Sequence, residues 1–244
     1  MRRARILGSA RSNIYHCMSR IIERQMVLDD TEKERFRWVM RAVARFAGIE
    51  IFTYALMGNH IHILLQVPER QELSEEEILD RILGLYGKDY TDDLVFTLNE
   101  YRKDGRHRDV ECVLNSYTRR MYDLSQYMKM LMQRFTQSYN RRHDRRGTLW
   151  EGRFKSILVE GSSHAITTMG AYIDLNAVRA GMVEDPRQYR FCGYGEATGG
   201  GKEAQRGIQM ISEALGIIGS WNNHSRTYRK HLYMQAATHM KGAG

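Results

Sequence analysis

The stretch that decides the fold is residues 54–68, which read YALMGNHIHILLQVP. It is an apolar, β-branched run in which His60 and His62 flank a single isoleucine, and this pattern predicts a strand. Successive side chains of a strand point to opposite faces, so the two imidazoles share one face, roughly 6.6 Å apart along the backbone. The other face is expected to enter a core with Ile61, Ile63 and Leu65.

Two interpretations of this histidine pair are open. Two imidazoles at this spacing can bind one metal ion, which favours metal or phosphate chemistry. Alternatively, they occupy the polar face of a half-buried strand, and short motifs of this kind often match by chance. The pair alone does not decide between these interpretations.

The composition is typical of a globular protein, with 42% hydrophobic and 10% aromatic residues among 244. This length favours a single domain with an insertion or a tail. No apolar run approaches the roughly 18 residues of a membrane span, and the basic residues 2–11 lack the apolar segment of a signal peptide. We therefore expect a cytoplasmic protein without a membrane partner. Three distant cysteines predict neither a disulfide framework nor a zinc-cysteine site.

The formal net charge of +8 is unevenly distributed. Residues 69–111 hold thirteen acidic residues against seven Lys or Arg, so the rest of the chain carries a net +14. Between residues 133 and 155, seven basic residues face two acidic ones, and aromatic residues lie among them. This mixture suits single-stranded or distorted nucleic acid, although a solvated helix end has the same composition. The DNA-binding candidates are Arg134, Arg141, Arg142, Arg145, Arg146, Trp150, Arg153 and Lys155.

The first part of the chain predicts a strand, a helix and two further strands. Residues 13–20 alternate incompletely and predict the first strand. Asp29 and the two residues after it are typical of a helix N-terminus, and apolar residues recur at helical spacing up to Gly48. Residues 49–56 predict the second strand, which a tight turn at residues 57–59 joins to the histidine strand as a hairpin.

An acidic helical insertion is expected at residues 69–115. Ser74 and Glu77 form a capping box that opens one helix, and a second helix is expected around residues 91–101. Because the insertion is acidic, it is poorly suited to binding nucleic acid. It can instead pack on the flank of the domain, bind a partner or limit access to the site, and the sequence does not separate these roles.

The second half of the chain predicts two helices and a strand. A long amphipathic helix is expected from about Ser116 to Asn140, and its apolar stripe suits a core. Residues 154–160 predict a strand. Ser162 or Ser163 can then cap a helix that ends near Gly181.

This last helix carries Tyr172 and Asn176, which are four residues apart and so share one helical face, about 6 Å apart along the axis. A tyrosine phenol is a nucleophile once deprotonated, and a phosphate polarised by a metal makes its attack feasible. An asparagine oxygen can complete a metal shell with His60 and His62. The alternative is that Tyr172 packs in the core, as most tyrosines in the middle of a helix do.

Three motifs stand in order over residues 59–181. The first is NHIH at residues 59–62, the second runs from NRRH at residues 140–143 into GTLWEGRFKS at residues 147–156, and the third is YIDLNAVRAG at residues 172–181. Together they resemble the single-tyrosine HUH transposases, in particular the REP-associated tyrosine transposases. The resemblance covers roughly residues 9–197.

The resemblance implies an α+β fold, in which an antiparallel sheet backed by helices forms the HUH, ferredoxin-like palm. It implies a divalent metal, Mg²⁺ or Mn²⁺, held by His60, His62 and Asn176, and single-stranded or hairpin DNA as partner. Tyr172 is the implied nucleophile, which attacks the scissile phosphate and leaves a 5′-phosphotyrosine and a free 3′-hydroxyl. Rejoining reverses this step, so no nucleotide cofactor is needed.

Two departures from the family pattern are visible. Ala177 stands where the family often has proline, and the acidic insertion is longer than in the smallest members. We expect the catalytic domain to span residues 1–197 and a basic, partly helical tail to span residues 198–244. A helix is expected in this tail through Ile208, Ile211, Leu215 and Ile218.

Other residues keep two interpretations. His16, on the first predicted strand, can approach the metal or can be a satisfied histidine of the sheet. Trp150 can stack on a base or fill the core. Arg153 and Lys155 can bind phosphates or lie exposed at the start of a strand. The basic residues 226–231 can grip a DNA hairpin or form a solvated end.

Two other functions stand beside the DNA strand transferase. One is a non-catalytic binder of structured DNA or RNA on the same fold, and the other is a small-molecule metallohydrolase that shares only the histidine pair. The charge of +14 outside the insertion disfavours a small neutral substrate. The sequence leaves open the hairpin sequence, the cleavage position, whether the protein mobilises itself or processes chromosomal repeats, and whether it forms a homodimer.

Overall fold

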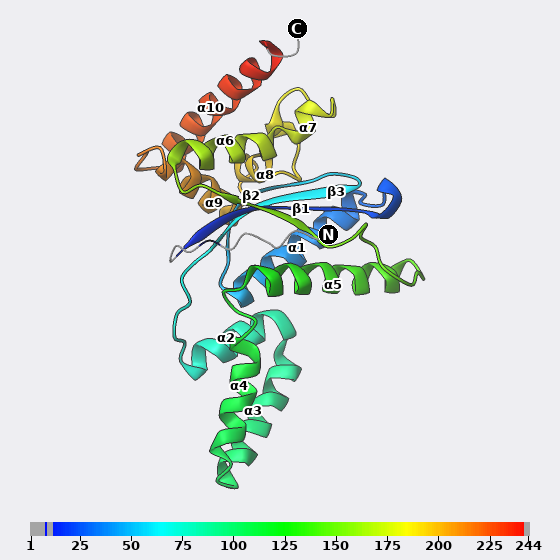
Figure 1. The fold of residues 1–244 in the computed structure, drawn as a ribbon, viewed down its shortest axis with the longest axis vertical. Coiled ribbons are helices and arrows are strands. Elements are labelled where there is room, and N and C mark those ends of the chain that lie inside the picture. The colour runs from blue at the N-terminus through cyan, green and yellow to red at the C-terminus, as the bar shows by residue number, and fades with distance from the viewer. Residues whose placement is uncertain (1–7, 9–11, 242–244) are drawn as a thin grey trace.

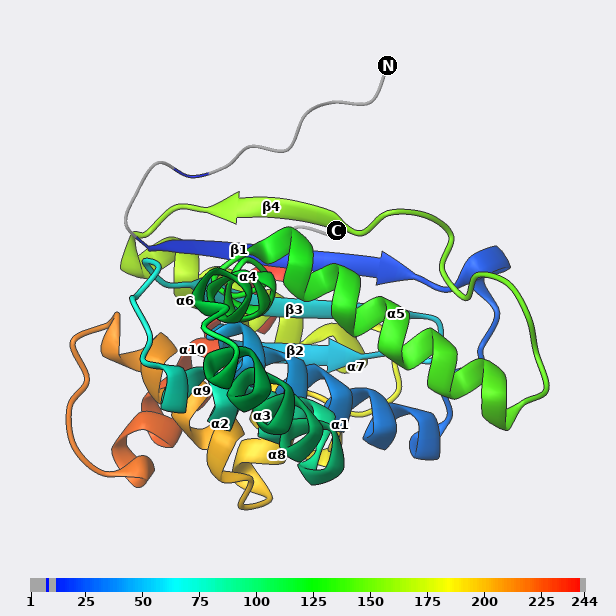
Figure 2. The same cartoon turned by 90° about the horizontal axis from the view of Figure 1, so that it is seen from below.

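The computed structural model describes Gly8 and residues 12–241, and it has the α+β fold that the sequence predicts. Its centre is one antiparallel four-stranded sheet with the strand order β2-β3-β1-β4 (Figures 1 and 2). The strands are β1 (Asn13–Arg20), β2 (Glu50–Leu56), β3 (His60–Val67) and β4 (Lys155–Val159). Each of these strands lies within a residue or so of its predicted bounds.

Helices cover both faces of this sheet (Figure 1). One face is covered by α1 (Asp30–Ala47) and α5 (Leu124–Arg142), and the other by α6 (Ser163–Asp174), α8 (Gly193–Thr198) and α9 (Lys202–Glu213). The remaining helical segments are η1 (Ile22–Arg24), α2 (Glu75–Tyr86), α3 (Lys88–Lys103), α4 (His107–Thr118), α7 (Asn176–Arg179), η2 (Pro186–Gln188) and α10 (Trp221–Lys241). Over the described part of the chain, none of these helices is both long and apolar enough to span a membrane.

The central strand β3 divides its side chains between the two faces as the alternation predicts. Ile61, Ile63 and Leu65 are fully buried on the face that α1 and α5 cover. The helix α1 is held at both ends by the expected residues. The side chain of Asp29 accepts a hydrogen bond from the backbone nitrogen of Glu32 (2.8 Å), and Gly48 ends the helix with a φ of 65°.

Helices α2, α3 and α4 form a helical arm that projects away from the sheet (Figure 1). The capping box of Ser74 and Glu77 at the start of α2 is confirmed. Helix α4 is not predicted from the sequence, and the prediction that the long helix begins at about Ser116 is wrong. Tyr122 has a positive φ of 55°, which interrupts the helix, and α5 begins afterwards at Leu124. The apolar residues on the two sides of this break keep a helical spacing, which hides the break in the sequence.

Much of the C-terminal segment, expected to be a tail, packs on the main core through α9 and the first part of α10. Helix α9 lies against β2 at Gly207, where a Cβ atom would lie 2.2 Å from the carbonyl oxygen of Phe52. Only glycine permits this close backbone approach. The expected tail helix ends at Glu213, so Leu215 and Ile218 lie beyond it and are exposed. The buried members of this segment include Ile208, Ile211, Tyr228 and Leu232.

A buried carboxylate joins α6 to the elements around it. Asp174, fully buried at the end of α6, accepts hydrogen bonds from the Thr53 hydroxyl (2.8 Å), the Tyr194 backbone nitrogen (2.9 Å) and the Tyr228 hydroxyl (2.7 Å). These donors come from β2, α8 and α10 respectively. Burial raises the pKa of Asp174 to about 6, so each donor matters to the charged form. The network therefore fixes α6, and with it Tyr172, against the sheet.

We expect Tyr228→Phe to lower the free energy of unfolding by about 1–3 kcal/mol, because it leaves a buried carboxylate oxygen without its donor. Urea denaturation at pH 7.5, followed by circular dichroism, measures this change. Tyr101→Phe on α3 is the matched control, since Tyr101 contacts Arg106 through its ring, which phenylalanine keeps. Equal stability of the two variants would contradict the role given to this network.

Candidate active site

The register between β1 and β3 gathers a polar cluster on the face that α6 covers. Arg20 lies opposite His60, Met18 lies opposite His62, and His16 lies opposite Leu64. Side chains at directly opposite positions of an antiparallel pair share one face of the sheet. The predicted histidine pair is thus joined by Arg20 and His16 from the neighbouring strand.

The two histidines of β3 are each held through the Nδ1 atom. His60 Nδ1 lies 2.6 Å from Asn59 Oδ1, and His62 Nδ1 lies 2.8 Å from His16 Nε2. The amide oxygen of Asn59 can only accept, so Nδ1 of His60 donates and its Nε2 keeps a lone pair. The rings of His60 and His62 are 5.2 Å apart and nearly perpendicular, at 86°. This arrangement is suited to two imidazoles that bind one ion from two directions.

Tyr172 lies on α6, directly above these rings. Its own ring is 6.1 Å from that of His62 and 6.0 Å from that of His16, and its side chain is 39% exposed. The guanidinium of Arg179 lies 4.6 Å from the Tyr172 ring and also donates to the Tyr172 carbonyl oxygen (2.7 Å). Arg179 thus contacts both the ring and the backbone of Tyr172. The alternative interpretation, in which Tyr172 is a core residue, does not fit its exposure.

Asn176 follows a break in the helix that the sequence analysis missed. The helix expected to run to Gly181 ends at Asp174, and Asn176 begins the short helix α7. The side-chain nitrogen of Asn176 donates to the carbonyl oxygens of Tyr172 and Ile173, both at 3.1 Å. These hydrogen bonds do not involve the Oδ1 atom of Asn176, which can accept a bond from a ligand. Asn176 still lies beside Tyr172, although the two are not on one continuous helix.

The four predicted site residues line a single cleft of about 380 Å³. The residues that line this cleft are Met18, Ser19, Arg20, Arg24, Asn59, His60, Ile61, His62, Tyr172 and Asn176. Among the described residues, no group of three or more His, Cys, Asp or Glu side chains could hold a metal ion. A metal in this cleft would therefore depend on two imidazoles and an amide oxygen.

The protonation of the histidines fits metal binding, which requires a neutral imidazole. Burial lowers the pKa of His62 to about 3, and the nearby histidines and Arg20 act in the same direction. Burial, followed by the charge of Arg20, also lowers the pKa of His60. Both rings are neutral near pH 7, and the lone pairs of His60 Nε2 and Asn176 Oδ1 are not taken by the contacts described above. The residues present thus fit a divalent ion.

Two of the DNA-binding candidates adjoin this cleft. Arg153 and Lys155 line a second cleft of about 300 Å³, which shares Met18, Ser19 and Arg20 with the first. Lys155 lies opposite Met18 in the pairing of β4 with β1, on the face of the sheet that carries the histidines. The two clefts together form a basic path that leads from Tyr172 across the edge strand β4.

Three of the remaining DNA-binding candidates do not lie at the cleft, and the prediction that Trp150 can stack on a base is wrong. Trp150 is only 6% exposed and its indole nitrogen donates to the Thr136 hydroxyl (2.9 Å), so it fills the core and cannot stack on a base. Arg142 is paired with the buried Glu32, and the Arg134 guanidinium lies 4.6 Å from the Tyr86 ring. These arginines belong to α5, on the face opposite Tyr172 (Figure 1).

Three exposed or half-exposed arginines remain near the end of α5. They are Arg141, Arg145 and Arg146. Beyond them, the chain passes beside η1, where the Ile22 nitrogen donates to the Leu149 carbonyl oxygen (3.0 Å; Figure 2). This segment therefore lies at the end of the sheet where the candidate cleft opens.

Arg20, Arg24 and Arg179 lie at the site but are not predicted from the sequence, which leaves two interpretations of His16 open. Arg20 and His16 alternate with Met18 along one strand, but only the pairing with β3 shows that they face the histidines. Arg179 lies seven residues after Tyr172, inside the third motif, and that spacing of about two helical turns was the available signal.

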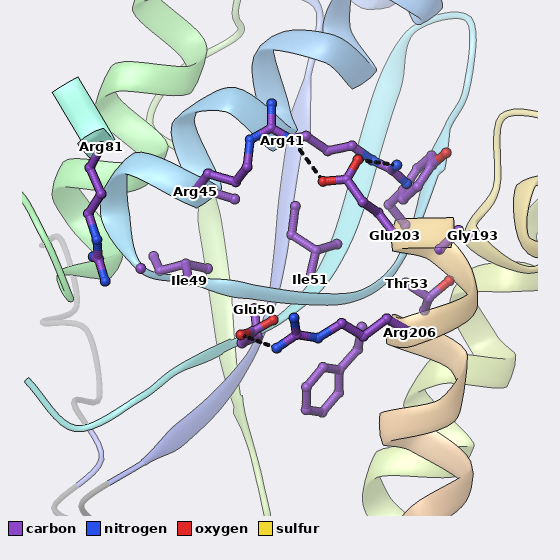
Figure 3. A pocket seen from close by; sticks show the side chains of 15 residues that line it. Arg41, Arg45, Ile49, Glu50, Ile51, Thr53, Arg81, Gly193, Glu203 and Arg206 are labelled. Atoms are coloured by element: carbon purple, nitrogen blue, oxygen red, sulfur yellow. Dashed lines mark hydrogen bonds and ion pairs between the residues drawn. The ribbon is translucent and has the colours of Figure 1, made fainter. Parts of the chain in front are cut away.

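A separate cavity of about 320 Å³ lies between α1, β2 and α9 (Figure 3). Arginines line it, but Arg41 and Arg45 pair with Glu203, and Arg206 pairs with Glu50. Two carboxylates of the cavity are therefore shared among three of its four arginines. We assign no chemistry to it.

Comparison with known proteins agrees with this geometry. Residues 9–91 match the family model described as "Transposase IS200 like", a region that contains β3 and ends before Tyr172. The fold resembles that of a REP-associated tyrosine transposase solved with a REP hairpin, with a TM-score of 0.50 and 14% identity over 80% of this chain and 84% of that chain. The comparison with curated proteins gave no match.

A weaker structural likeness is to a candidate transposase from Deinococcus radiodurans. Its TM-score is 0.34, with 16% identity over 71% of this chain and 96% of that chain. The family model and the fold of the REP-associated transposase support the resemblance that the sequence motifs indicate. The family match over residues 9–91 supports a transposase-like role in DNA processing for this chain, and the structural likeness supports the fold.

We expect the metal-free protein to lose stability as the pH falls from about 6.5 toward 4. Burial lowers the pKa of His16 to about 4 and that of His62 to about 3, whereas the same groups in the unfolded chain bind protons below about 6.5. Their contribution to stability is therefore present above pH 6.5 and is lost as the pH falls toward the folded pKa values. In His62→Gln, the free energy of unfolding that is lost between pH 6.5 and 4 should be smaller by about a few kcal/mol.

Urea denaturation between pH 4 and 7.5 measures this dependence. His107→Gln, which removes an exposed histidine of α4, is the control and should keep the slope of the unchanged protein. A slope that is the same in all three proteins would show that the buried histidines are not held neutral.

Proposed function

We propose that this protein is a metal-dependent endonuclease and strand transferase that cleaves single-stranded DNA next to a hairpin. The observation that carries the proposal is the convergence of Tyr172, His60, His62 and Asn176 on one cleft. His60 and His62 lie on β3, whereas Tyr172 and Asn176 lie on α6 and α7, more than a hundred positions further along the chain. The fold therefore brings together residues that are distant in sequence. The basic path through Arg20, Arg153 and Lys155 supports a polyanionic substrate.

His60, His62 and Asn176 would hold Mg²⁺ or Mn²⁺ through imidazole nitrogens and an amide oxygen, a mixed set that suits Mn²⁺ somewhat better than Mg²⁺. When bound, the ion supplies Lewis-acid polarisation of a phosphate oxygen. Arg179 contacts the Tyr172 ring and would help to position the phenol for attack. The site is open enough for Tyr172 to meet a phosphodiester without a change of fold.

In the proposed step, the phenol oxygen of Tyr172 attacks the scissile phosphorus. The bond from phosphorus to the 3′ oxygen breaks as the bond to the tyrosine forms, and the phenol proton is lost to solvent while the 3′ oxygen gains one. The products are a 5′-phosphotyrosine and a free 3′-hydroxyl. Because a phosphodiester replaces a phosphodiester, attack by a 3′-hydroxyl on the phosphotyrosine reverses the step without a nucleotide cofactor.

We expect Tyr172→Phe to abolish covalent attachment of DNA and to leave DNA binding within about twofold, since only the nucleophilic oxygen is removed. The assay incubates the protein with labelled hairpin oligonucleotides carrying single-stranded flanks, with Mn²⁺ or EDTA, and resolves adducts on a denaturing gel. Tyr233→Phe, at an exposed tyrosine of α10, is the control and should form the adduct.

An adduct that persists in Tyr172→Phe would overturn the assignment of the nucleophile. Tight hairpin binding by the unchanged protein, with no adduct under any metal condition, would instead favour the non-catalytic binder of structured nucleic acid.

We expect Arg20→Gln to weaken binding of single-stranded DNA and to reduce the slope of log K against log salt by about 0.7, the value for one phosphate contact on a single strand. Binding is measured in the Tyr172→Phe background so that cleavage does not interfere. Arg45→Gln is the control, because Arg45 is similarly exposed but lies on α1, away from the cleft. An unchanged salt slope in Arg20→Gln would remove Arg20 from the DNA path.

A further inference from the structure

His16 is a buried histidine that contacts the candidate metal ligand His62 and that the proposed function does not use. It is 2% exposed, its ring stacks on that of His62 at 5.1 Å and 22°, and its Nε2 lies 2.8 Å from His62 Nδ1. A hydrogen bond between two imidazoles has a single proton, so one ring donates and the other accepts. Which ring donates decides which nitrogen of His62 is left for a ligand.

The two possible arrangements have opposite consequences for the site. If His16 donates, neutral His62 carries its own proton on Nε2, and that nitrogen cannot bind a metal. If His62 donates from Nδ1, its Nε2 has a free lone pair, as in His60, where the oxygen of Asn59 fixes the same tautomer. The two ligands of β3 would then bind through equivalent atoms.

We propose that His16 is a positioning residue that accepts the Nδ1 proton of His62 and so presents His62 Nε2 to a divalent cation. This inference rests on the proposed metal-dependent function, and it assigns to His16 the role that Asn59 has for His60.

Three observations support this role over that of a third metal ligand. The Nε2 atom of His16 is already occupied by the contact with His62. Its other nitrogen, Nδ1, is buried and has no hydrogen-bond partner in the described structure. His16 lies opposite Leu64, two residues along β1 from Met18, which lies opposite His62. His16 is not among the residues that line the cleft. His16 thus contacts His62 on the side of its ring that faces away from the cleft.

The Nδ1 atom of His16 has no hydrogen-bond partner in the described structure, which lowers the stability of the folded protein. A buried polar group without a partner is destabilising, typically by about 1–3 kcal/mol, and such groups are uncommon in folded proteins. An apolar residue at position 16 would avoid this cost and could still pack against His62 and Tyr172. A histidine at this position is explained if its Nε2 atom accepts the hydrogen bond that orients His62.

The expected effect of removing His16 is on metal affinity. Outer partners of ligating histidines typically change metal affinity by about 10–100-fold when they are replaced. We expect His16→Leu to weaken Mn²⁺ binding by about this factor, because it keeps the packing but removes the acceptor. His16→Gln offers an amide oxygen as acceptor, and we expect it to restore part of the affinity.

Mn²⁺ affinity is measured without DNA, by the electron paramagnetic resonance signal of the free ion during titration of the full-length protein. Cys17→Ala is the matched control, since Cys17 is the next residue of β1, is equally buried and points to the opposite face. It should bind Mn²⁺ as the unchanged protein does. Equal affinity of His16→Leu and the unchanged protein would overturn the inference and leave the proposed function standing.

A second measurement uses the unchanged protein and so does not depend on a variant that folds. In ¹⁵N-labelled protein saturated with Mg²⁺, nuclear magnetic resonance should show coupling across an N–H···N bond, with the proton bonded to Nδ1 of His62. A proton bonded to Nε2 of His16 would overturn the inference. Failure of the unchanged protein to bind Mn²⁺ or Mg²⁺ at all would overturn the metal dependence of the proposed function, and the inference with it.

Discussion

The register of β3 against β1 is the constraint on which the rest of the site depends. A strand has a period of two, so a slip of one residue would turn His60 and His62 into the core and expose Ile61, Ile63 and Leu65. Burial of these three side chains is worth several kcal/mol, at about 1.5–3 kcal/mol for each. The hydrophobic core thus sets the register, and the register brings Arg20 and His16 beside the histidine pair. Burial of the apolar face of β3 therefore places the polar residues of the site together on the opposite face.

The other half of the site is fixed by a polar network and not by apolar packing. Asp174 binds donors from β2, α8 and α10, and it lies two residues after Tyr172. Because these hydrogen bonds are directional, they set the rotation of α6 as well as its depth. The C-terminal segment, through Tyr228, is therefore part of what holds the nucleophile over the histidines. Tyr228 and Leu232 of this segment are buried in the core, together with Ile208 and Ile211.

The sequence was sufficient for the sheet and for most of the candidate site, because strong local signals lie there. Alternation around His60, the cap at Asp29 and the closing Gly48 each depend on neighbouring residues, and the structure agrees with all three. What local patterns could not show were the breaks at Tyr122 and after Asp174, where the apolar spacing continues across a change of direction. They also could not show that Trp150 enters the core, which depends on contact with the distant α1 and α5. The assignment of a role to each site residue remains a prediction that only chemistry can test.

The central claim is that one divalent cation binds between β3 and α7, at Tyr172. The most direct test is a crystal structure of the full-length protein soaked in Mn²⁺, with data collected near the manganese absorption edge. The account predicts one anomalous peak in the cleft, within about 2.0–2.3 Å of His60 Nε2, His62 Nε2 and Asn176 Oδ1, as expected for nitrogen and oxygen ligands of such ions. A cleft without an anomalous peak at saturating Mn²⁺, or a peak bound by other residues, would contradict it.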